Sequence, residues 1–315
     1  MSHSFPKLES VNSIVESLAT AGYICNEQIA TVVYLAAELE KPVLVEGPPG
    51  VGKTELAKSC AQVTGAPLVR LQCYEGLDES KAIYEWKYGK QLLYTQLLKT
   101  QLSEVIEGAK GLRASVERLH SFDDVFFSKD FLEPRPLLQA INAEGGVVLL
   151  VDEIDKADFE FESLLLEVLS DFQVSIPELG TLKGRSKPLV FLTSNDTRDL
   201  SDALKRRCLH LHIDFPTTEL EGRIVRARVP QITEAMTDHL VNFVSKVREM
   251  DLKKLPSVSE TIDWAKSLVL LHADSLDEEL VKSSLNVLLK YEEDLTSVVE
   301  NLVDLLNTEK QAASA

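Results

Sequence analysis

The sequence predicts an α/β fold, in which a parallel β-sheet carries helices on both faces, followed by a small all-α domain. Five short apolar runs bounded by turn residues predict the strands: 43–46, 68–73, 147–151, 189–194 and 209–213. Segments with helical periodicity lie between them. Strands that are apolar along their whole length and alternate with helices are typical of a parallel sheet buried on both faces.

The predicted helices show their starts as well as their periodicity. Asp158 is a suitable N-cap for the apolar stripe Phe161, Leu165, Val168, Leu169 and Phe172. After residue 215 the strand patterns stop, and three pairs have capping-box spacing: Thr218 with Glu221, Ser257 with Glu260 and Ser275 with Glu278. We therefore expect an α/β domain over 1–215 and a helical lid domain over 216–315 that ends in a polar tail.

Composition limits the classes of function. The chain has 315 residues and a formal net charge of −17, whereas binding to nucleic acid needs a concentrated basic surface, so we expect no nucleic-acid partner. No apolar run could span a bilayer and no export signal is visible, which favours a cytoplasmic protein. The four cysteines are scattered, as expected for reduced thiols. His210 and His212 could share a strand face and bind a metal, although such a pair is more often structural.

The stretch GPPGVGKT, residues 47–54, follows the first predicted strand and precedes a predicted helix. This context is the one that a phosphate-binding P-loop requires, because backbone N–H groups at a helix N-terminus converge on phosphate oxygens. Lys53 would reach the β and γ phosphates, and the Thr54 hydroxyl would bind Mg²⁺. The alternative is a tight glycine turn. The predicted nucleotide-binding residues are Gly47, Pro48, Pro49, Gly50, Val51, Gly52, Lys53, Thr54 and Glu55.

Two further strand ends supply polar groups for the same site. In VVLLVDEID, Asp152 would hold the Mg²⁺ shell and Glu153 would orient and deprotonate a water molecule. In VFLTSND, Asn195 would donate to the γ phosphate or hold the attacking water. The alternatives are a solvated acidic turn at 152–153 and a plain turn start at Asn195.

With these motifs in this order, the chain resembles the AAA+ ATPases and, within them, the MoxR family, from about Ala21 to about Leu306. Further points of resemblance are GYICNE, RPLLQAI and a pre-sensor-1 hairpin near 172–188. The family carries a helix-2 insertion where this chain has residues 74–92. The motif LQCYEGLDESKAIYEW is similar to a MoxR branch associated with carbon monoxide dehydrogenase maturation.

The resemblance gives a role to one of two adjacent arginines. Laid on the MoxR-like pattern LPEAQLDRF, the stretch LSDALKRRC places Arg207 at the arginine finger, which reaches the γ phosphate of a neighbouring subunit, and leaves Arg206 in reserve. Alternatively, both arginines cap a helix C-terminus. The chain departs from the family at sensor 2, where an arginine is common and Ser259 and Glu260 stand here.

The resemblance implies an Mg²⁺-dependent ATPase that works as a ring, and by resemblance to the family that ring is a hexamer. It also implies a chaperone-like role in maturing a client metalloenzyme or inserting its metal cofactor, with a von Willebrand factor A-type partner. Tyr84, Trp86 and Tyr88 recur at period two, which would place three aromatics on one side of an extended loop. This loop could bind the client or a partner, whereas packing on the sheet is the commoner fate of such aromatics. The alternative functions for the chain are an NTP-driven nucleic-acid motor or restriction component, and a P-loop kinase that acts as a monomer on a small molecule.

Overall fold

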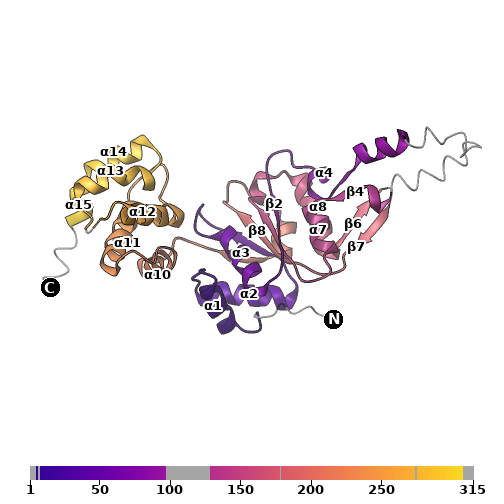
Figure 1. Cartoon of the computed structure of the whole chain (residues 1–315), viewed down its shortest axis with the longest axis horizontal. Helices are drawn as coiled ribbons and strands as arrows, with labels where there is room; N and C mark the ends of the chain where they lie inside the picture. The colour runs from indigo at the N-terminus through magenta and orange to yellow at the C-terminus, as the bar shows by residue number, and fades with distance from the viewer. Residues whose placement is uncertain (1–4, 6–7, 97–127, 178, 274, 308–315) are drawn as a thin grey trace, which may run out of the picture.

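The central sheet has the predicted architecture. The computed structural model describes residues 5, 8–96, 128–177, 179–273 and 275–307. Five parallel strands lie in the order β2-β5-β8-β1-β9. Strands β2 and β8 of this sheet are labelled in Figure 1. They are β1 (Val43–Glu46), β2 (Leu68–Gln72), β5 (Val148–Asp152), β8 (Leu189–Ser194) and β9 (Leu209–His212). Each coincides with a predicted apolar run to within one residue at either end, which confirms the α/β fold class.

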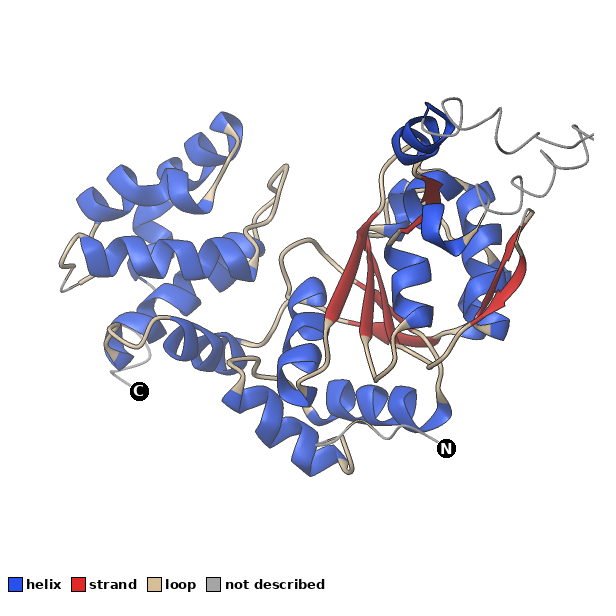
Figure 2. Cartoon of the chain, turned by 45° about the vertical axis from the view of Figure 1, so that its right-hand side comes forward, coloured by secondary structure: helices blue, strands red, loops and turns tan. Residues whose placement is uncertain are grey.

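Alternate residues of the strands supply two cores, one on each face of the sheet. Val43 and Val45 of β1 pack into one core and Leu44 into the other, as the two-residue period of a strand requires. The first core is covered by α1 (Val11–Thr20), α2 (Glu27–Leu39) and α3 (Lys53–Thr64). The second is covered by α7 (Pro136–Asn142), α8 (Phe159–Asp171) and α9 (Asp202–Arg207), so helices flank both faces (Figure 2).

Two small antiparallel sheets lie outside the central one. Strand β3 (Tyr84–Trp86) pairs with β4 (Leu132–Pro134), next to the single turn of α4 (Glu79–Ala82) and the 3₁₀ turn η1 (Lys129–Phe131). Strands β6 (Gln173–Ile176) and β7 (Gly180–Lys183) form a hairpin within the range 172–188. The 3₁₀ turn η2 (Ile154–Lys156) follows β5 directly.

The C-terminal helices form a separate lobe beside the sheet domain (Figure 1). They are α10 (Thr218–Arg228), α11 (Glu234–Arg248), α12 (Val258–Leu270), α13 (Glu278–Leu288), α14 (Glu292–Glu300) and α15 (Leu302–Asn307). Their apolar faces share a core of their own around the fully buried Trp264. A buried ion pair joins α10 to α11, because the Arg248 guanidinium donates to both oxygens of Glu221 at 2.6 and 2.8 Å.

The helix starts agree only partly with the predicted caps. Asp158 accepts the N–H of Phe161, and Ser257 forms a complete capping box with Glu260, as predicted. The other two predicted caps are wrong by one or two residues. The N-caps are instead Thr217 and Asp277. Their side-chain oxygens accept backbone N–H groups in the first turns of α10 and α13.

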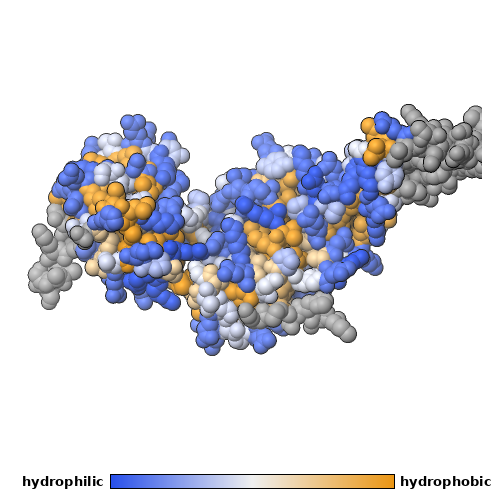
Figure 3. Space-filling view, in the orientation of Figure 1, coloured by the Kyte–Doolittle hydropathy of each residue, from blue (hydrophilic) through white to orange (hydrophobic). Residues whose placement is uncertain are grey.

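The three aromatics predicted to share one side of an extended loop do not do so. Tyr84 and Trp86 lie on β3, with ring centroids 5.9 Å apart, and Trp86 is only 8% exposed in the core under the sheet. Tyr88 is 65% exposed and lies in a helical segment, 88–96. The period-two pattern ends where β3 ends, so the aromatics separate. Apolar surface instead gathers on segment 88–96, next to the residues drawn in grey in Figure 3.

We therefore expect Trp86→Ala to destabilise the fold, at a cost of about 3–5 kcal/mol, the usual range for truncating a buried Trp. Urea unfolding followed by circular dichroism measures this cost. Tyr88→Ala is the matched control, since its side chain is exposed, and it should change the free energy of unfolding by about 0.5 kcal/mol or less. Equal stability of the two variants would contradict the burial of Trp86.

Candidate active site

The loop 47–52 joins β1 to α3 and passes close to two other segments. Gly47 has φ 142°, and a Cβ there would lie 2.0 Å from the backbone oxygen of Ile213, so a side chain cannot fit. A Cβ at Gly50 would lie 2.4 Å from the Ser257 hydroxyl at the start of α12. The glycines thus allow the loop to approach both the end of β9 and the lid.

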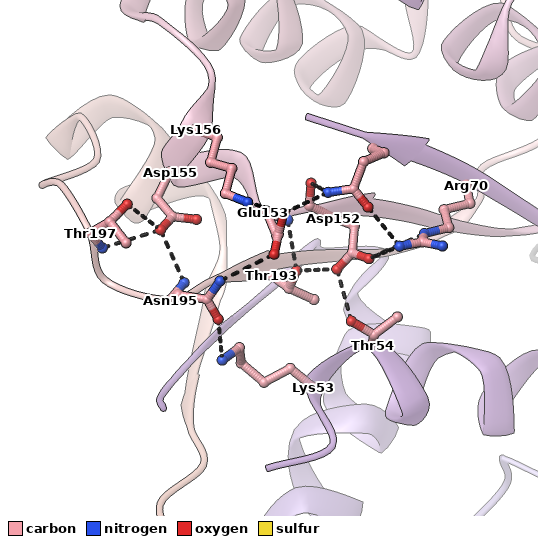
Figure 4. A network of polar contacts seen from close by, with 11 residues as sticks. Lys53, Thr54, Arg70, Asp152, Glu153, Asp155, Lys156, Thr193, Asn195 and Thr197 are labelled. Atoms are coloured by element: carbon pink, nitrogen blue, oxygen red, sulfur yellow. Dashed lines mark hydrogen bonds and ion pairs between the residues drawn. The ribbon is translucent and has the colours of Figure 1, made fainter. Parts of the chain in front are cut away.

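Lys53 is the first residue of α3, and its ammonium group is buried. It donates to the carbonyl oxygens of Gly47 at 2.5 Å and Pro48 at 2.7 Å, and to the side-chain oxygen of Asn195 at 2.8 Å (Figure 4). Burial lowers the pKa of Lys53 from 10.5 to about 8, while the nearby carboxylates, Asp155 first, oppose that shift. A bound anion would add to the carboxylates and favour the charged form.

Asp152 is the last residue of β5 and is 3% exposed. Its Oδ1 accepts the hydroxyls of Thr54 at 2.9 Å and Thr193 at 2.6 Å. Its Oδ2 accepts Nε and Nη2 of Arg70 at 3.1 and 2.6 Å. The carboxylate therefore lies directly beside the Thr54 hydroxyl, with all of its contacts supplied by neighbouring elements of the sheet domain.

Glu153 follows Asp152 and has a left-handed backbone, with φ 57° and ψ 51°. This conformation is uncommon for a residue with a side chain and often occurs at functional sites. The Glu153 N–H donates to Thr193, which helps to hold the turn. The Glu153 carboxylate accepts from Gln72 at 2.8 Å, Lys156 at 2.7 Å and Asn195 at 3.4 Å, so it faces the same space as Lys53.

Asn195 connects the two ends of this network, since its side chain contacts both Lys53 and Glu153. The turn that carries it is held by Asp155, which is 4% exposed. Asp155 accepts the backbone N–H groups of Asn195 and Thr197 at 3.2 and 3.1 Å, and the Thr197 hydroxyl at 2.6 Å. These hydrogen bonds hold the turn after β8 against η2.

These groups line two adjoining cavities. A polar one of about 350 Å³ is lined by Lys53, Thr54, Asp152, Glu153 and Asn195, among others. A larger one of about 700 Å³ lies between residues 22–29, residues 212–217 and the lid helices α10 and α12. Gly50, Gly52, Glu55 and Ser259 line both cavities. The pair offers a polar space for phosphates beside a roomier space for a base and a sugar.

The lid contributes no arginine at the sensor 2 place. Ser259 lines both cavities, and its hydroxyl lies 3.4 Å from the carbonyl oxygen of Gly50. Glu260 is occupied by the capping box and by Lys254 at 2.9 Å. A different lid cation reaches the loop region, because Arg228 of α10 donates to Glu55 at 2.6 Å.

Arg207 and Arg206 are exposed and line neither of these cavities. Arg207 Nε donates to the Ser170 hydroxyl at 2.6 Å, and its Nη1 lies 3.5 Å from the Ala203 carbonyl oxygen of its own helix. The structure thus does not bring Arg207 to the site of its own chain. The second contact is of the kind expected if Arg207 caps the C-terminus of its own helix, the alternative to the finger role.

The oxygen groups at the site suit a magnesium ion. Mg²⁺ prefers oxygen ligands and usually keeps several waters, with one or two carboxylates nearby. Asp152 and Thr54 provide adjacent oxygens at the wall of a polar cavity that can also hold water and phosphate. The two histidines offer no such group, since His210 pairs with Glu46 at 2.6 Å and His212 with Asp214 at 3.0 Å.

Residues 42–208 match the family model described as AAA domain (dynein-related subfamily). This match covers more than half of the chain and includes every site residue named above from Gly47 to Arg207. The chain belongs to this AAA domain family.

Two curated relatives match about two thirds of this chain. The gas vesicle ATPase GvpN of Haloferax mediterranei is 29% identical over 238 residues, which are 70% of this chain and 60% of that protein. The gas vesicle ATPase GvpN1 of Halobacterium salinarum is 26% identical over 232 residues, 67% and 58% of the two chains. The chain therefore spans about 60% of the length of these relatives.

Among solved structures, this AAA protein is similar to RuvB of Thermotoga maritima, described as a Holliday junction branch migration motor. The identity is 18% and the TM-score 0.47, with 94% of this chain and 79% of that chain covered. The P216G mutant of that RuvB gives 15% identity and a TM-score of 0.49, with 94% and 80% covered.

Several contacts of this AAA site were missed by sequence reasoning. They come from Arg70, Gln72, Asp155 and Thr193, whose partners are set by the register of β2 and β8 against β5. One signal was available. In the predicted strand 68–73, Arg70 and Gln72 interrupt the apolar run at a spacing of two, which indicates that both point to one face.

Proposed function

We propose that this chain hydrolyses ATP in an Mg²⁺-dependent reaction. The observation that carries the proposal is the meeting of three separate strand ends at one polar cavity of about 350 Å³. The loop after β1 supplies Lys53 and Thr54, β5 supplies Asp152 and Glu153, and β8 supplies Asn195. Family membership and the names of the GvpN relatives support the same activity.

Each residue has a role that follows from its position. Asp152 and Thr54 would hold Mg²⁺, which when bound neutralises phosphate charge and orients the triphosphate. Lys53 exchanges its bonds with backbone carbonyls and Asn195 for bonds with phosphate oxygens. Glu153 accepts a proton from the attacking water, and Asn195, already 3.4 Å from Glu153, positions that water.

Arg207 completes the site from a neighbouring protomer in our proposal. It lies exposed on α9 and lines neither cavity of its own chain. It could therefore act at a nucleotide site only in a neighbouring protomer, across an interface. A head-to-tail interface that repeats around an axis closes a ring. Such a ring, a hexamer by resemblance to MoxR proteins, would place Arg207 of each protomer at the phosphate of the next.

The work done with ATP is proposed from the sequence resemblance. By likeness to MoxR proteins, the ring would remodel a client metalloenzyme during maturation or metal insertion, with a von Willebrand factor A-type partner, in the cytoplasm. The motif at 71–86 favours the branch associated with carbon monoxide dehydrogenase. None of the described helices is long and apolar enough to cross a membrane. The net charge of −17 disfavours a nucleic-acid motor.

Phosphate release from ATP by the purified chain tests the proposed activity. We expect turnover that needs Mg²⁺, that stops in EDTA, and that falls at least about 100-fold in Lys53→Ala, since charge stabilisation by a single preorganised group commonly contributes this much. Lys205→Ala is the matched control, because Lys205 is an exposed lysine of α9 outside both cavities. Turnover that persists in Lys53→Ala or in EDTA would exclude this site as its source.

A further inference from the structure

The surroundings of Asp152 contain a cation that the proposed reaction does not use. Asp152 is buried, and both of its oxygens are occupied, Oδ1 by two hydroxyls and Oδ2 by Arg70. The Arg70 guanidinium donates through both Nε and Nη2 to the single oxygen Oδ2, at 3.1 and 2.6 Å, and charge-assisted hydrogen bonds of this kind are stronger than neutral ones. Asp152 is also the carboxylate proposed to hold Mg²⁺. One carboxylate therefore faces two possible positive partners.

Arg70 and Asp152 differ in their freedom to move. The Arg70 side chain is 48% exposed, whereas that of Asp152 is 4% exposed. Arg70 lies on β2 and lines the rim of the polar cavity, with one further side-chain contact, from Nη2 to Gln72 at 2.6 Å. The guanidinium can turn into solvent without opening the core. Asp152 cannot leave its place at the end of β5, which lies between β2 and β8 in the sheet.

We propose that Arg70 is a displaceable countercation of Asp152. It neutralises the buried carboxylate when no divalent cation is near, and it moves away from Oδ2 when a divalent cation binds beside Thr54. A buried carboxylate without a cation is strongly disfavoured, which is why a stand-in stabilises the metal-free state. This inference rests on the proposed function, since it takes Asp152 to be part of a magnesium site.

The proposal fixes the direction of an effect on metal affinity. While Arg70 occupies Asp152, the metal site is blocked. The apparent Mg²⁺ affinity is therefore the intrinsic affinity multiplied by the fraction of protein in which the site is free. Two positive charges at one carboxylate also repel each other. Removing Arg70 should therefore tighten Mg²⁺ binding. If Arg70 instead held Asp152 permanently in position for the metal, its removal would weaken Mg²⁺ binding.

The experiment titrates Mg²⁺ into the full chain with a non-hydrolysable ATP analogue present, followed by isothermal calorimetry. We expect Arg70→Met to bind Mg²⁺ about tenfold more tightly than the wild type. Arg70→Lys keeps a cation at the rim and should stay within about threefold of the wild type. Arg185→Met, which removes an exposed arginine paired with Glu144 outside the site, is the control and should not change the affinity.

Thermal unfolding gives a second reading that also serves if Arg70→Met folds poorly. In EDTA, Arg70→Met should melt at a lower temperature than the wild type, and Mg²⁺ with the analogue should remove most of that difference. Unchanged or weaker Mg²⁺ binding by Arg70→Met, beside normal wild-type binding, would overturn the countercation role alone. Absence of Mg²⁺-dependent nucleotide binding in the wild type would overturn the proposed function itself.

Discussion

Glu153→Gln is expected to lower the rate of ATP hydrolysis by about two to four orders of magnitude, the range contributed by a general base. Glutamine has the size of glutamate and retains a side-chain oxygen that can accept from Gln72 and Lys156. It cannot take a proton from water. The uncommon backbone at φ 57° is kept, since neither residue is β-branched. Nucleotide affinity should therefore stay within about threefold of the wild type, because binding depends on Lys53 and Thr54.

Single-turnover phosphate release and equilibrium binding of a fluorescent ATP analogue separate these two effects. Glu160→Gln is the matched control, because Glu160 is an exposed carboxylate in the first turn of α8. It should hydrolyse ATP at the wild-type rate. Should Glu153→Gln keep more than about a tenth of the wild-type rate, Glu153 is not the base. A variant that binds ATP without hydrolysing it also suits a pull-down of the client, which would test the chaperone-like role.

Arg207→Ala is expected to lower hydrolysis by about three orders of magnitude or more if Arg207 acts on the neighbouring site, the range given by arginine fingers. The decisive form of the test mixes two inactive variants. In a mixed ring, a Glu153→Gln protomer can supply Arg207 to an Arg207→Ala protomer, whose Glu153 is intact. Random mixing in equal amounts makes about a quarter of the sites complete, so the mixture should recover up to about a quarter of wild-type turnover.

The neighbouring arginine provides the matched control. Arg206→Ala should keep near wild-type turnover, because the alignment with the family pattern places Arg207 and not Arg206 at the finger position. Equal loss in Arg206→Ala would move the role to that residue. No recovery in the mixture, with normal ring formation by both variants, would show that Arg207 does not act in trans, and its contacts with Ser170 and Ala203 would then be its function.

The strands were predictable because burial on both faces of a parallel sheet leaves a continuous apolar run. Each of the five runs became a strand of the central sheet. The site residues could be placed at strand ends for the same reason, and Lys53, Asp152, Glu153 and Asn195 do line one cavity. Tyr23 and Ile24 line the larger cavity.

Other features depend on information that one-dimensional patterns do not hold. Arg70 reaches Asp152 because β2 lies beside β5 in a register that pairs Gln72 with Asp152. The sequences of the two strands do not predict that they are neighbours. The sequence left open whether Trp86 lies in a partner-binding loop or packs on the sheet. The pairing of β3 with β4, more than 40 residues away, buries it. Caps failed where two capping side chains stood close together, as at Thr217 and Thr218.

The central claim is that groups from three strand ends form one site for Mg²⁺ and a triphosphate. A structure of the chain with Mg²⁺ and a non-hydrolysable ATP analogue tests it most directly. We predict the terminal phosphate between Lys53 and Glu153, the metal beside Thr54 and Asp152, and the base in the larger cavity near Tyr23. A nucleotide bound elsewhere, with Lys53 still donating to Asn195 and the Gly47 carbonyl, would contradict the claim.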